Sequence, residues 1–298
     1  MRQSTDPPTQ RRLLCRRLRQ ARIDAGYTQQ RAGTDLGWST SKLLRIEAGQ
    51  VGLSRTDLRA MLDLYGVRNP PARCQLEAMA RVARRQPWAA FRDVLSPSEQ
   101  RYLSCEGSAL RLRQYEPALV PELLRTDAYA WAVLKALALP GTPDQVLKRK
   151  HEACLARQAI LDRGDRPQLC FVVDEAALRR AVRDRNGGGT IMSDQTKRLH
   201  ELAGRPDLSL QVLPLSVGPH PGLATPFMLL DFFDADHASL VYLPGRARPV
   251  RTATDDVTAY NRVFADLAAA ASPPHTFPTV LDQIMLQRAD PNAEETTR

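Results

Sequence analysis

Three aspartates and two histidines lie close together between residues 220 and 237, and side chains of these types can bind a metal ion or transfer protons. They are His220, Asp231, Asp234, Asp236 and His237. The run from Asp234 to His237 falls between two predicted strands, where a polar hairpin turn is expected. No Ser-His-Asp set, P-loop or H-E-x-x-H pattern accompanies it. We therefore expect no metal site and no enzymatic activity, and the role of the Asp231–His237 turn stays open.

The five cysteines show no metal-binding spacing either. They are Cys15, Cys74, Cys105, Cys154 and Cys170. No C-x-x-C pair occurs, which argues against a zinc site. An odd number of widely spaced cysteines is typical of free thiols in a reducing cytosol. The sequence thus predicts no cofactor, and single buried thiols are the simplest interpretation.

Charge indicates a different chemistry, the recognition of a polyanion. Residues 1–68 hold 13 Lys and Arg against 6 Asp and Glu, a net charge of +7. The rest of the chain holds 29 against 27, a net charge of only +2. Positive side chains contact phosphates and supply the sequence-independent part of the affinity for nucleic acid. The placement of the charge therefore favours an N-terminal domain that binds nucleic acid.

The stretch QQRAGTDLGWSTSKLLRIEAG, residues 29–49, predicts two short helices joined by a sharp turn. Gly33 is the small residue that lets the second helix pass close to the first, and Gly37 allows the turn between them. Leu36, Leu43 and Ile46 are the apolar residues expected to hold the pair against neighbouring helices. This combination is typical of a helix-turn-helix DNA-binding motif.

The second helix of the pair is expected to present short polar and cationic side chains to the major groove. We predict seven DNA-binding residues: Gln29, Ser39, Thr40, Ser41, Lys42, Leu44 and Arg45. Ser39 is also a natural N-cap, and Gln29 is placed to bind a phosphate. A single recognition helix reads only a few base pairs, so a homodimer on a two-fold double-stranded DNA operator is expected.

Apolar periodicity and capping residues predict the helices that position this motif. They span residues 11–25, 28–36 and 40–48, with a fourth helix after Ser54. Gly26 closes the first helix, and Ser54 with Asp57 predicts a capping box. The predicted division is a disordered lead at 1–10, a helix-turn-helix domain at 11–68, a regulatory and dimerisation domain at 72–285 and a flexible tail at 286–298. Asn69-Pro70-Pro71 marks the expected break.

Beyond that break, the sequence predicts helices from Ala72 to about Leu161, and then strands alternate with helices. Strands are expected at 168–173, 208–213, 227–233 and 240–243, and helices at 174–183, 193–203 and 254–271. A flexible loop is expected at Asn186–Gly189. The two strands between 168 and 213 can pair in parallel through a right-handed helical crossover, and the last two strands can add a hairpin.

Residues from Arg11 to Val67 resemble the Xre/Cro-type phage-repressor helix-turn-helix family. The matching residues are Thr28-Gln29, Gly33, Gly37, Arg45-Ile46-Glu47 and Gly49. The resemblance implies that Gln29 contacts a backbone phosphate, that Thr40, Ser41, Leu44 and Arg45 read base edges, and that Glu47 is structural. Leu44 is apolar where polar residues are common, so we expect it to contact a thymine methyl group. The implied fold class is multidomain, an all-α five-helix Xre-type domain followed by an α+β domain with a helical layer and then a mixed β-sheet with helices.

The larger domain carries a resemblance of its own. The matching pieces are YEPALVPELLRTDAYA (115–130), ARQAIL (156–161), FVVDEAALRRAV (171–182), LQVLPLSVGPHPG (210–222) and FMLLDFF (227–233). With the N-terminal motif, they resemble the WhiJ-like, antitoxin-like regulators of actinobacteria. That resemblance implies control by a small protein partner encoded nearby. Two departures stand out, Glu122 where glycine is usual and Arg125 where glutamine is usual.

The sequence leaves two kinds of regulation open. Control by a small protein is one, and sensing of a small molecule by the larger domain is the other. Five aromatic residues either line a pocket or belong to the core: Trp88, Phe91, Tyr115, Tyr129 and Trp131. The chain has no apolar run long enough to span a membrane, and without an apolar stretch near its start no secretory signal is expected. We therefore expect a cytoplasmic transcription regulator.

Overall fold

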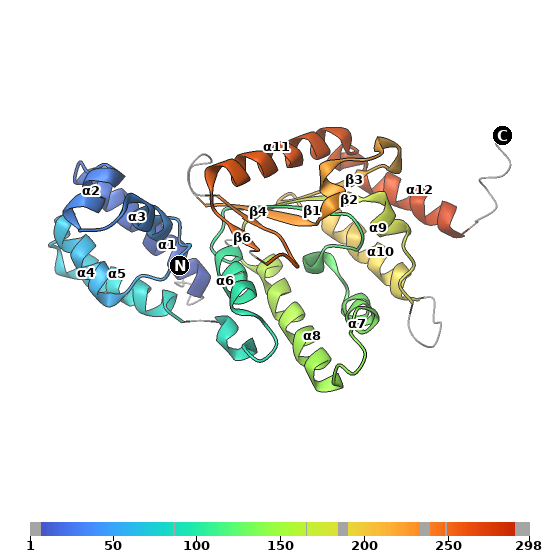
Figure 1. Ribbon diagram of the computed structural model, residues 1–298, viewed down its shortest axis with the longest axis horizontal. Helices are drawn as coiled ribbons and strands as arrows, with labels where there is room; N and C mark the ends of the chain where they lie inside the picture. The colour runs from blue at the N-terminus through green and yellow to red at the C-terminus, as the bar shows by residue number, and fades with distance from the viewer. Residues whose placement is uncertain are drawn as a thin grey trace. The chain divides into compact units, whose positions relative to one another are not determined.

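The computed structural model describes residues 7–85, 87–164, 166–183, 190–232, 239–247 and 249–289 (Figure 1). These residues form two compact units. The first comprises the chain up to Leu110 together with Leu230–Ser239, and the second comprises the remainder. Four predicted segments lie wholly or largely outside the described residues: positions 1–6 of the lead, the Asn186–Gly189 loop, the Asp234–His237 turn and the tail beyond Ala289.

The helices and strands follow in chain order, with the labels of Figure 1. The helices are α1 (Pro7–Asp24), α2 (Gln29–Asp35), α3 (Thr40–Glu47), α4 (Arg55–Leu64), α5 (Pro70–Ala83), α6 (Pro97–Glu106), α7 (Asp127–Ala136), α8 (Asp144–Gln158), α9 (Glu175–Arg179), α10 (Thr190–Ala203), α11 (Thr254–Ala270) and α12 (Phe277–Ala289). The strands are β1 (Arg111–Glu116), β2 (Gln168–Asp174), β3 (Leu208–Leu213), β4 (Phe227–Asp231), β5 (Leu240–Tyr242) and β6 (Val250–Arg251).

Five helices, α1 to α5, share one hydrophobic core in the first unit. Leu18, Leu43, Met61 and Leu62 are fully buried there, and Leu76 of α5 packs against the same cluster. Burying a side chain of this size contributes about 1.5–3 kcal/mol, so the core holds the short helices α2 and α3 in place. The prediction of an all-α five-helix domain is confirmed.

Two predicted boundaries of this domain need correction. The lead expected to be disordered up to residue 10 is helical from Pro7 onward. Asn69-Pro70-Pro71 is the start of α5 rather than a break, because the Asn69 side chain accepts a hydrogen bond from the Ala72 N–H at 3.3 Å. Proline suits the first turn of a helix, where its missing N–H has no partner to lose. The first unit therefore continues through α5 and α6.

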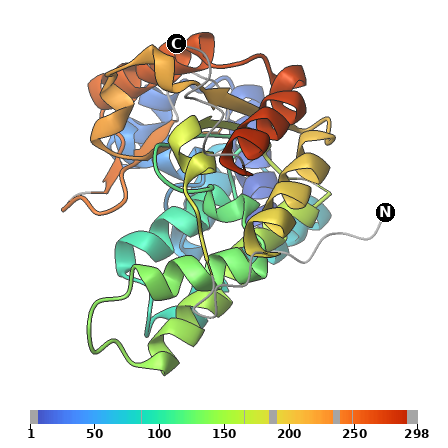
Figure 2. The ribbon, with the colours of Figure 1, turned by 90° about the vertical axis from the view of Figure 1, so that its right-hand side faces the viewer.

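The second unit contains most of a six-stranded mixed sheet with the strand order β3-β2-β1-β4-β5-β6. Strands β1, β2 and β3 run parallel, whereas β5 and β6 run antiparallel. Helix α11 covers one face, and α7 and α8 lie on the opposite side (Figures 1 and 2). Phe264 of α11 packs against Tyr115, Val172 and Phe227 of the sheet. The predicted α+β class and the parallel pairing of 168–173 with 208–213 are confirmed.

The prediction that the region from Ala72 to about Leu161 contains only helices is wrong at Arg111–Glu116, which forms strand β1. This six-residue segment is too short to reveal its period, and its partner β2 lies more than fifty residues further along the chain. Pairing with β2 on one side and β4 on the other satisfies its backbone groups and overrides the local sequence. The tail also begins later than expected, because α12 continues to Ala289.

Within the described residues, no helix is both long and apolar enough to cross a membrane.

Candidate nucleic-acid interface

Helices α2 and α3 meet at Gly33, as the motif requires. A Cβ atom on this glycine would lie 3.2 Å from the carbonyl oxygen of Trp38 and 3.5 Å from the backbone nitrogen of Thr40. Gly37 has a φ of 67°, a left-handed conformation that side chains with a Cβ rarely adopt. The roles predicted for both glycines, close approach and turn, are confirmed.

Each helix of the pair begins with a side-chain cap. The Thr28 hydroxyl accepts a hydrogen bond from the Arg31 N–H at 3.1 Å, and the Ser39 hydroxyl accepts one from the Lys42 N–H at 3.2 Å. Such caps stabilise a helix by about 1 kcal/mol, which matters for helices of two turns. The predicted cap at Ser39 is confirmed, and its hydroxyl is therefore engaged within the protein.

A buried ion pair joins α1 to the end of α3. The Arg22 Nε lies 2.6 Å from one Glu47 carboxylate oxygen, and the two side chains are 7% and 3% exposed. Gln29 adds a third connection, because its Nε2 donates to Glu47 at 2.9 Å. Arg22 also donates to the Tyr27 carbonyl at 2.7 Å. Glu47 thus fixes three helices, and its predicted structural role is confirmed.

The outward face of α3 carries the side chains proposed to read DNA. Thr40, Ser41 and Arg45 are exposed, and Leu44 is half-buried. Arg45 donates from its Nε to the Ser41 carbonyl at 3.2 Å, which leaves the rest of its guanidinium group outward. Leu43 and Ile46 lie on the opposite face, in the core. A polar outward face on a helix fixed from behind matches the geometry of a recognition helix.

Lys42 differs from its neighbours on α3 because it is held within the protein. Its ammonium lies 3.0 Å from the Asp57 carboxylate of α4 and 3.8 Å from the centre of the Trp38 ring. Burial works against the charge on Asp57, but hydrogen bonds from Ser54 and Lys42 lower the pKa of this carboxyl. Ser54 caps α4, as expected, by accepting from the Asp57 N–H at 2.9 Å. Lys42 therefore joins α3 to α4.

The cations of α4 and α5 carry no motif that marks them in the sequence. Arg55, Arg59, Arg81 and Arg84 line one cavity between these two helices. The spacing of Arg55 and Arg59, one helical turn apart, was the available signal. The sequence does not show that α5 packs beside Arg55 and Arg59, because that contact depends on the tertiary structure.

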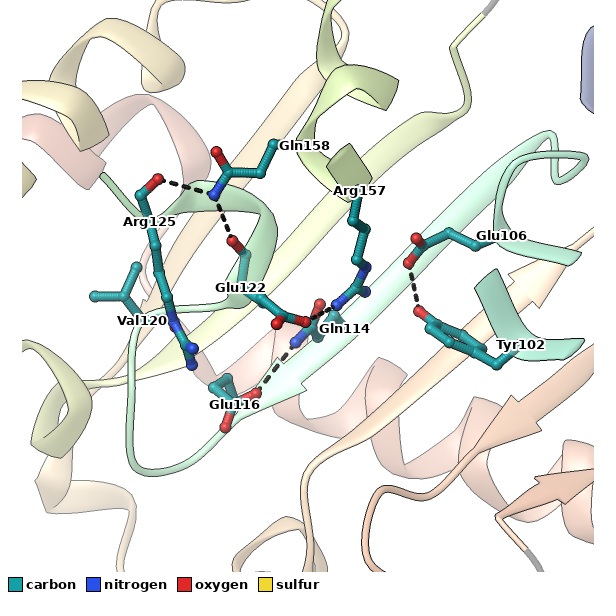
Figure 3. Close-up of polar contacts among 9 residues, drawn as sticks. All are labelled: Tyr102, Glu106, Gln114, Glu116, Val120, Glu122, Arg125, Arg157 and Gln158. Carbon is teal, nitrogen blue, oxygen red and sulfur yellow. Dashed lines mark hydrogen bonds and ion pairs between the residues drawn. The ribbon is translucent and has the colours of Figure 1, made fainter. Parts of the chain in front are cut away.

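The departures at Glu122 and Arg125 form an internal network in the second unit (Figure 3). Glu122 forms an ion pair with Arg157 of α8, whose side chain is 5% exposed. Gln158 donates to the backbone oxygens of Glu122 and Arg125 at 2.9 and 3.0 Å. Although burial opposes it, the nearby Arg157 lowers the pKa of Glu122. These residues hold the turn against α8.

Glu116, at the end of β1, lies beside this network (Figure 3). Burial raises its pKa to about 7, against the opposing effect of Arg125. Its carboxylate accepts a hydrogen bond from Gln114 at 3.1 Å. The Glu116 carboxyl group can therefore gain or lose a proton near neutral pH, so the charge at this end of β1 depends on pH.

The five aromatic residues do not form one lining. Tyr115 and Tyr129 are fully buried core residues of the second unit, and Trp131 packs on His151 with ring centres 5.3 Å apart. Trp88 and Phe91 pair with each other in the first unit. The core interpretation holds for the two tyrosines.

His220 lies beside Tyr115 and Asp174, whereas Asp234, Asp236 and His237, with which it was grouped, lie outside the described residues. The Nε2 atom of His220 is 3.4 Å from the Tyr115 hydroxyl and 3.7 Å from an Asp174 carboxylate oxygen. The Tyr115 hydroxyl donates to Asp174 at 3.1 Å. These contacts attach the loop that contains His220 to the sheet. Among the residues that the structure describes, no group of three or more His, Cys, Asp or Glu side chains is placed to hold a metal ion.

Two family models match the chain. A helix-turn-helix domain matches residues 13–76, and a domain of unknown function, DUF5753, matches residues 100–282. No curated protein and no solved structure matches the chain. The first match supports a DNA-binding regulator, consistent with the exposed face of α3. Because the DUF5753 model covers more than half of the sequence, the chain belongs to the DUF5753 family, with a helix-turn-helix domain ahead of that domain.

Proposed function

We propose that this protein is a sequence-specific, DNA-binding regulator of transcription that acts in the cytoplasm and has no enzymatic activity of its own. The observation that carries the proposal is the arrangement of α3. Its outward face presents Thr40, Ser41 and Arg45, while Glu47 and Ile46 fix its other face within the domain. A rigid helix with short polar side chains and a guanidinium group suits the major groove.

The proposed reading mechanism assigns separate tasks to separate residues. Thr40, Ser41 and Arg45 contact base edges, and Leu44 packs on a thymine methyl group. Gln29 contacts a phosphate and sets the position of the domain on the duplex. Its side chain is already oriented by Glu47, so this contact needs little reorganisation.

The proposed base contacts are tested by replacing them one at a time. Arg45→Ala and Ser41→Ala are expected to lower the affinity for a specific operator by about 1–3 kcal/mol each and to change non-specific affinity less. Gln29→Ala is expected to weaken all sequences alike. Fluorescence anisotropy on operator and random duplexes measures both, after the operator is found by genome-wide mapping of bound DNA.

Arg68→Ala serves as the control, because this arginine is exposed outside the helix-turn-helix pair. It removes the same charge and is expected to leave discrimination between sequences unchanged. Equal losses on operator and random DNA for Arg45→Ala would contradict the proposed orientation of α3.

We further propose that the protein acts as a homodimer controlled by a small protein partner. A single helix-turn-helix domain is expected to bind DNA with a Kd in the non-specific range, about 10⁻⁴–10⁻⁶ M at physiological salt. When two such domains are joined in one dimer, binding of the first raises the effective concentration of the second at its half-site. The near-neutral charge beyond residue 68 suits protein contacts better than DNA contacts. The likeness to WhiJ-like, antitoxin-like regulators of actinobacteria supports a partner that counteracts DNA binding.

Light scattering on the full chain tests the dimer, and we expect twice the chain mass at micromolar concentration. A monomer at that concentration would contradict the proposal. Co-purification with the product of an adjacent small gene tests the partner. Absence of such binding, together with release of DNA by a metabolite, would instead favour the second candidate function, the sensing of a small molecule by the larger domain.

A further inference from the structure

A cavity of about 290 Å³ lies between α4 and α5, on helices that the DNA-reading face does not use. Its lining is Arg55, Leu58 and Arg59 of α4 with Cys74, Glu77, Ala78, Arg81 and Arg84 at α5. Four guanidinium groups and one carboxylate give the wall a net charge of +3. The volume is at the lower end of the range for small-molecule sites.

The charged groups of this wall are unpaired. Within the described residues, none of these four arginine side chains and no oxygen of Glu77 forms a hydrogen bond or an ion pair. Other arginines of the same unit do have partners, since Arg73 binds Asp63 at 2.8 Å and Arg17 binds Gln75 at 2.6 Å. Like charges gathered around a cavity raise its positive potential, which favours the binding of an anion.

Arg84 gives a second indication of a missing partner. Its Nη1 atom is buried and has no hydrogen-bond partner among the described residues. A buried N–H group without a hydrogen-bond partner is energetically unfavourable. Arg84 is half-buried and lines the cavity, so an anion there contacts the accessible part of its guanidinium group. Guanidinium groups bind phosphate and carboxylate oxygens in a bidentate manner, which makes arginine well suited to the task.

We propose that this cavity is a binding site for a small phosphorylated molecule that also carries a hydroxyl or amino group. A phosphate monoester brings a charge of about −1.5 to −2, which matches the +3 wall better than a single carboxylate does. The carboxylate of Glu77 accepts a hydrogen bond from the hydroxyl or amino group. Leu58 and Ala78 provide apolar contact for the rest of the ligand.

A free small molecule fits this site better than the DNA backbone does. The cavity is concave and is closed on two sides by helices, whereas a duplex presents its phosphates on a convex surface. A ligand there would contact both α4 and α5, and α4 is joined to the reading helix through Asp57 and Lys42. Occupancy is therefore expected to alter the reading helix without touching DNA.

The test uses the full chain and inorganic pyrophosphate as the probe, by isothermal titration calorimetry at constant ionic strength. We expect saturable binding to one site, weakened about tenfold or more by Arg84→Gln or Arg59→Gln, a change of about 1.4 kcal/mol per tenfold. Arg85→Gln is the matched control, because it removes the same charge from an exposed position outside the cavity. Equal weakening by Arg85→Gln, or no saturable binding, overturns the proposal.

Cys74 gives a readout confined to the site. Its thiol is exposed and free, and it lines the cavity. Pyrophosphate is expected to slow the alkylation of Cys74 by iodoacetamide, followed by mass spectrometry, and to leave that of Cys170 unchanged. Unprotected Cys74 in the presence of saturating pyrophosphate overturns the assignment of the site.

Duplex binding separates the two sources of phosphate. Arg59→Gln without added anion is expected to bind random DNA as the unmodified protein does. If it instead weakens binding to all duplexes while pyrophosphate does not bind, the cavity serves the DNA backbone and the proposal is wrong. Because Arg59 is exposed, this variant keeps the test valid if Arg84→Gln fails to fold.

Discussion

Replacing Gly33 with valine is expected to abolish specific DNA binding while the second unit stays folded. The first added carbon alone would lie 3.2 Å from the Trp38 carbonyl oxygen, closer than ordinary van der Waals contact, and that neighbour is backbone. The two further methyl groups of valine need more space than this single carbon. Overpacking of this kind costs about 1–3 kcal/mol. Relief by moving α3 tilts the outward face that carries Arg45.

Two variants separate this effect from the general cost of a β-branched residue. Gly33→Ala adds only the first carbon and is expected to have an intermediate effect on operator affinity. Gly164→Val adds the same side chain at an exposed position with nothing within 4 Å, and it is expected to bind operator normally. Electrophoretic mobility shift and circular dichroism measure binding and folding. Normal operator binding by Gly33→Val would show that the two helices do not cross at residue 33.

Removing the Glu47 carboxylate is expected to be the most destabilising single change in the first unit. Glu47→Ala leaves the Arg22 guanidinium buried without its counter-ion, and its side chain is only 7% exposed. Breaking a buried ion pair from one side costs about 3–5 kcal/mol, a large part of the stability of an ordinary domain. Gln29 also loses its partner. Urea unfolding of the full chain, followed by far-ultraviolet circular dichroism, measures the loss.

The exposed pair between Arg73 and Asp63 provides the comparison. Asp63 is 66% exposed, and Asp63→Asn is expected to change the free energy of unfolding by less than about 1 kcal/mol. The double variant Arg22→Met with Glu47→Leu is expected to recover most of the stability, because apolar side chains of similar size can replace a buried pair. A loss at Glu47→Ala no greater than that at Asp63→Asn would show that the ion pair does not stabilise the fold.

Local sequence was sufficient to predict the helix-turn-helix. The hydroxyls of Thr28 and Ser39 accept hydrogen bonds from N–H groups three residues away. Gly33 and Gly37, which allow the close approach and the turn, are only four residues apart. Caps, turns and the apolar stripe of a helix depend on neighbours in the chain. The same reasoning located β2 and β3, because continuous apolar runs such as Leu169 to Val173 favour buried strands.

Only the tertiary structure decided which residues far apart in sequence meet. Strand β1 is held by β2 and β4, so its local pattern did not reveal it. The pairing of Glu122 with Arg157, and of Arg22 with Glu47, joins residues separated by 35 and 25 positions. Arg59 and Arg84 look like ordinary surface cations in the sequence. They become one basic cavity only when α4 packs on α5, because packing determines which charges face each other and which keep their water.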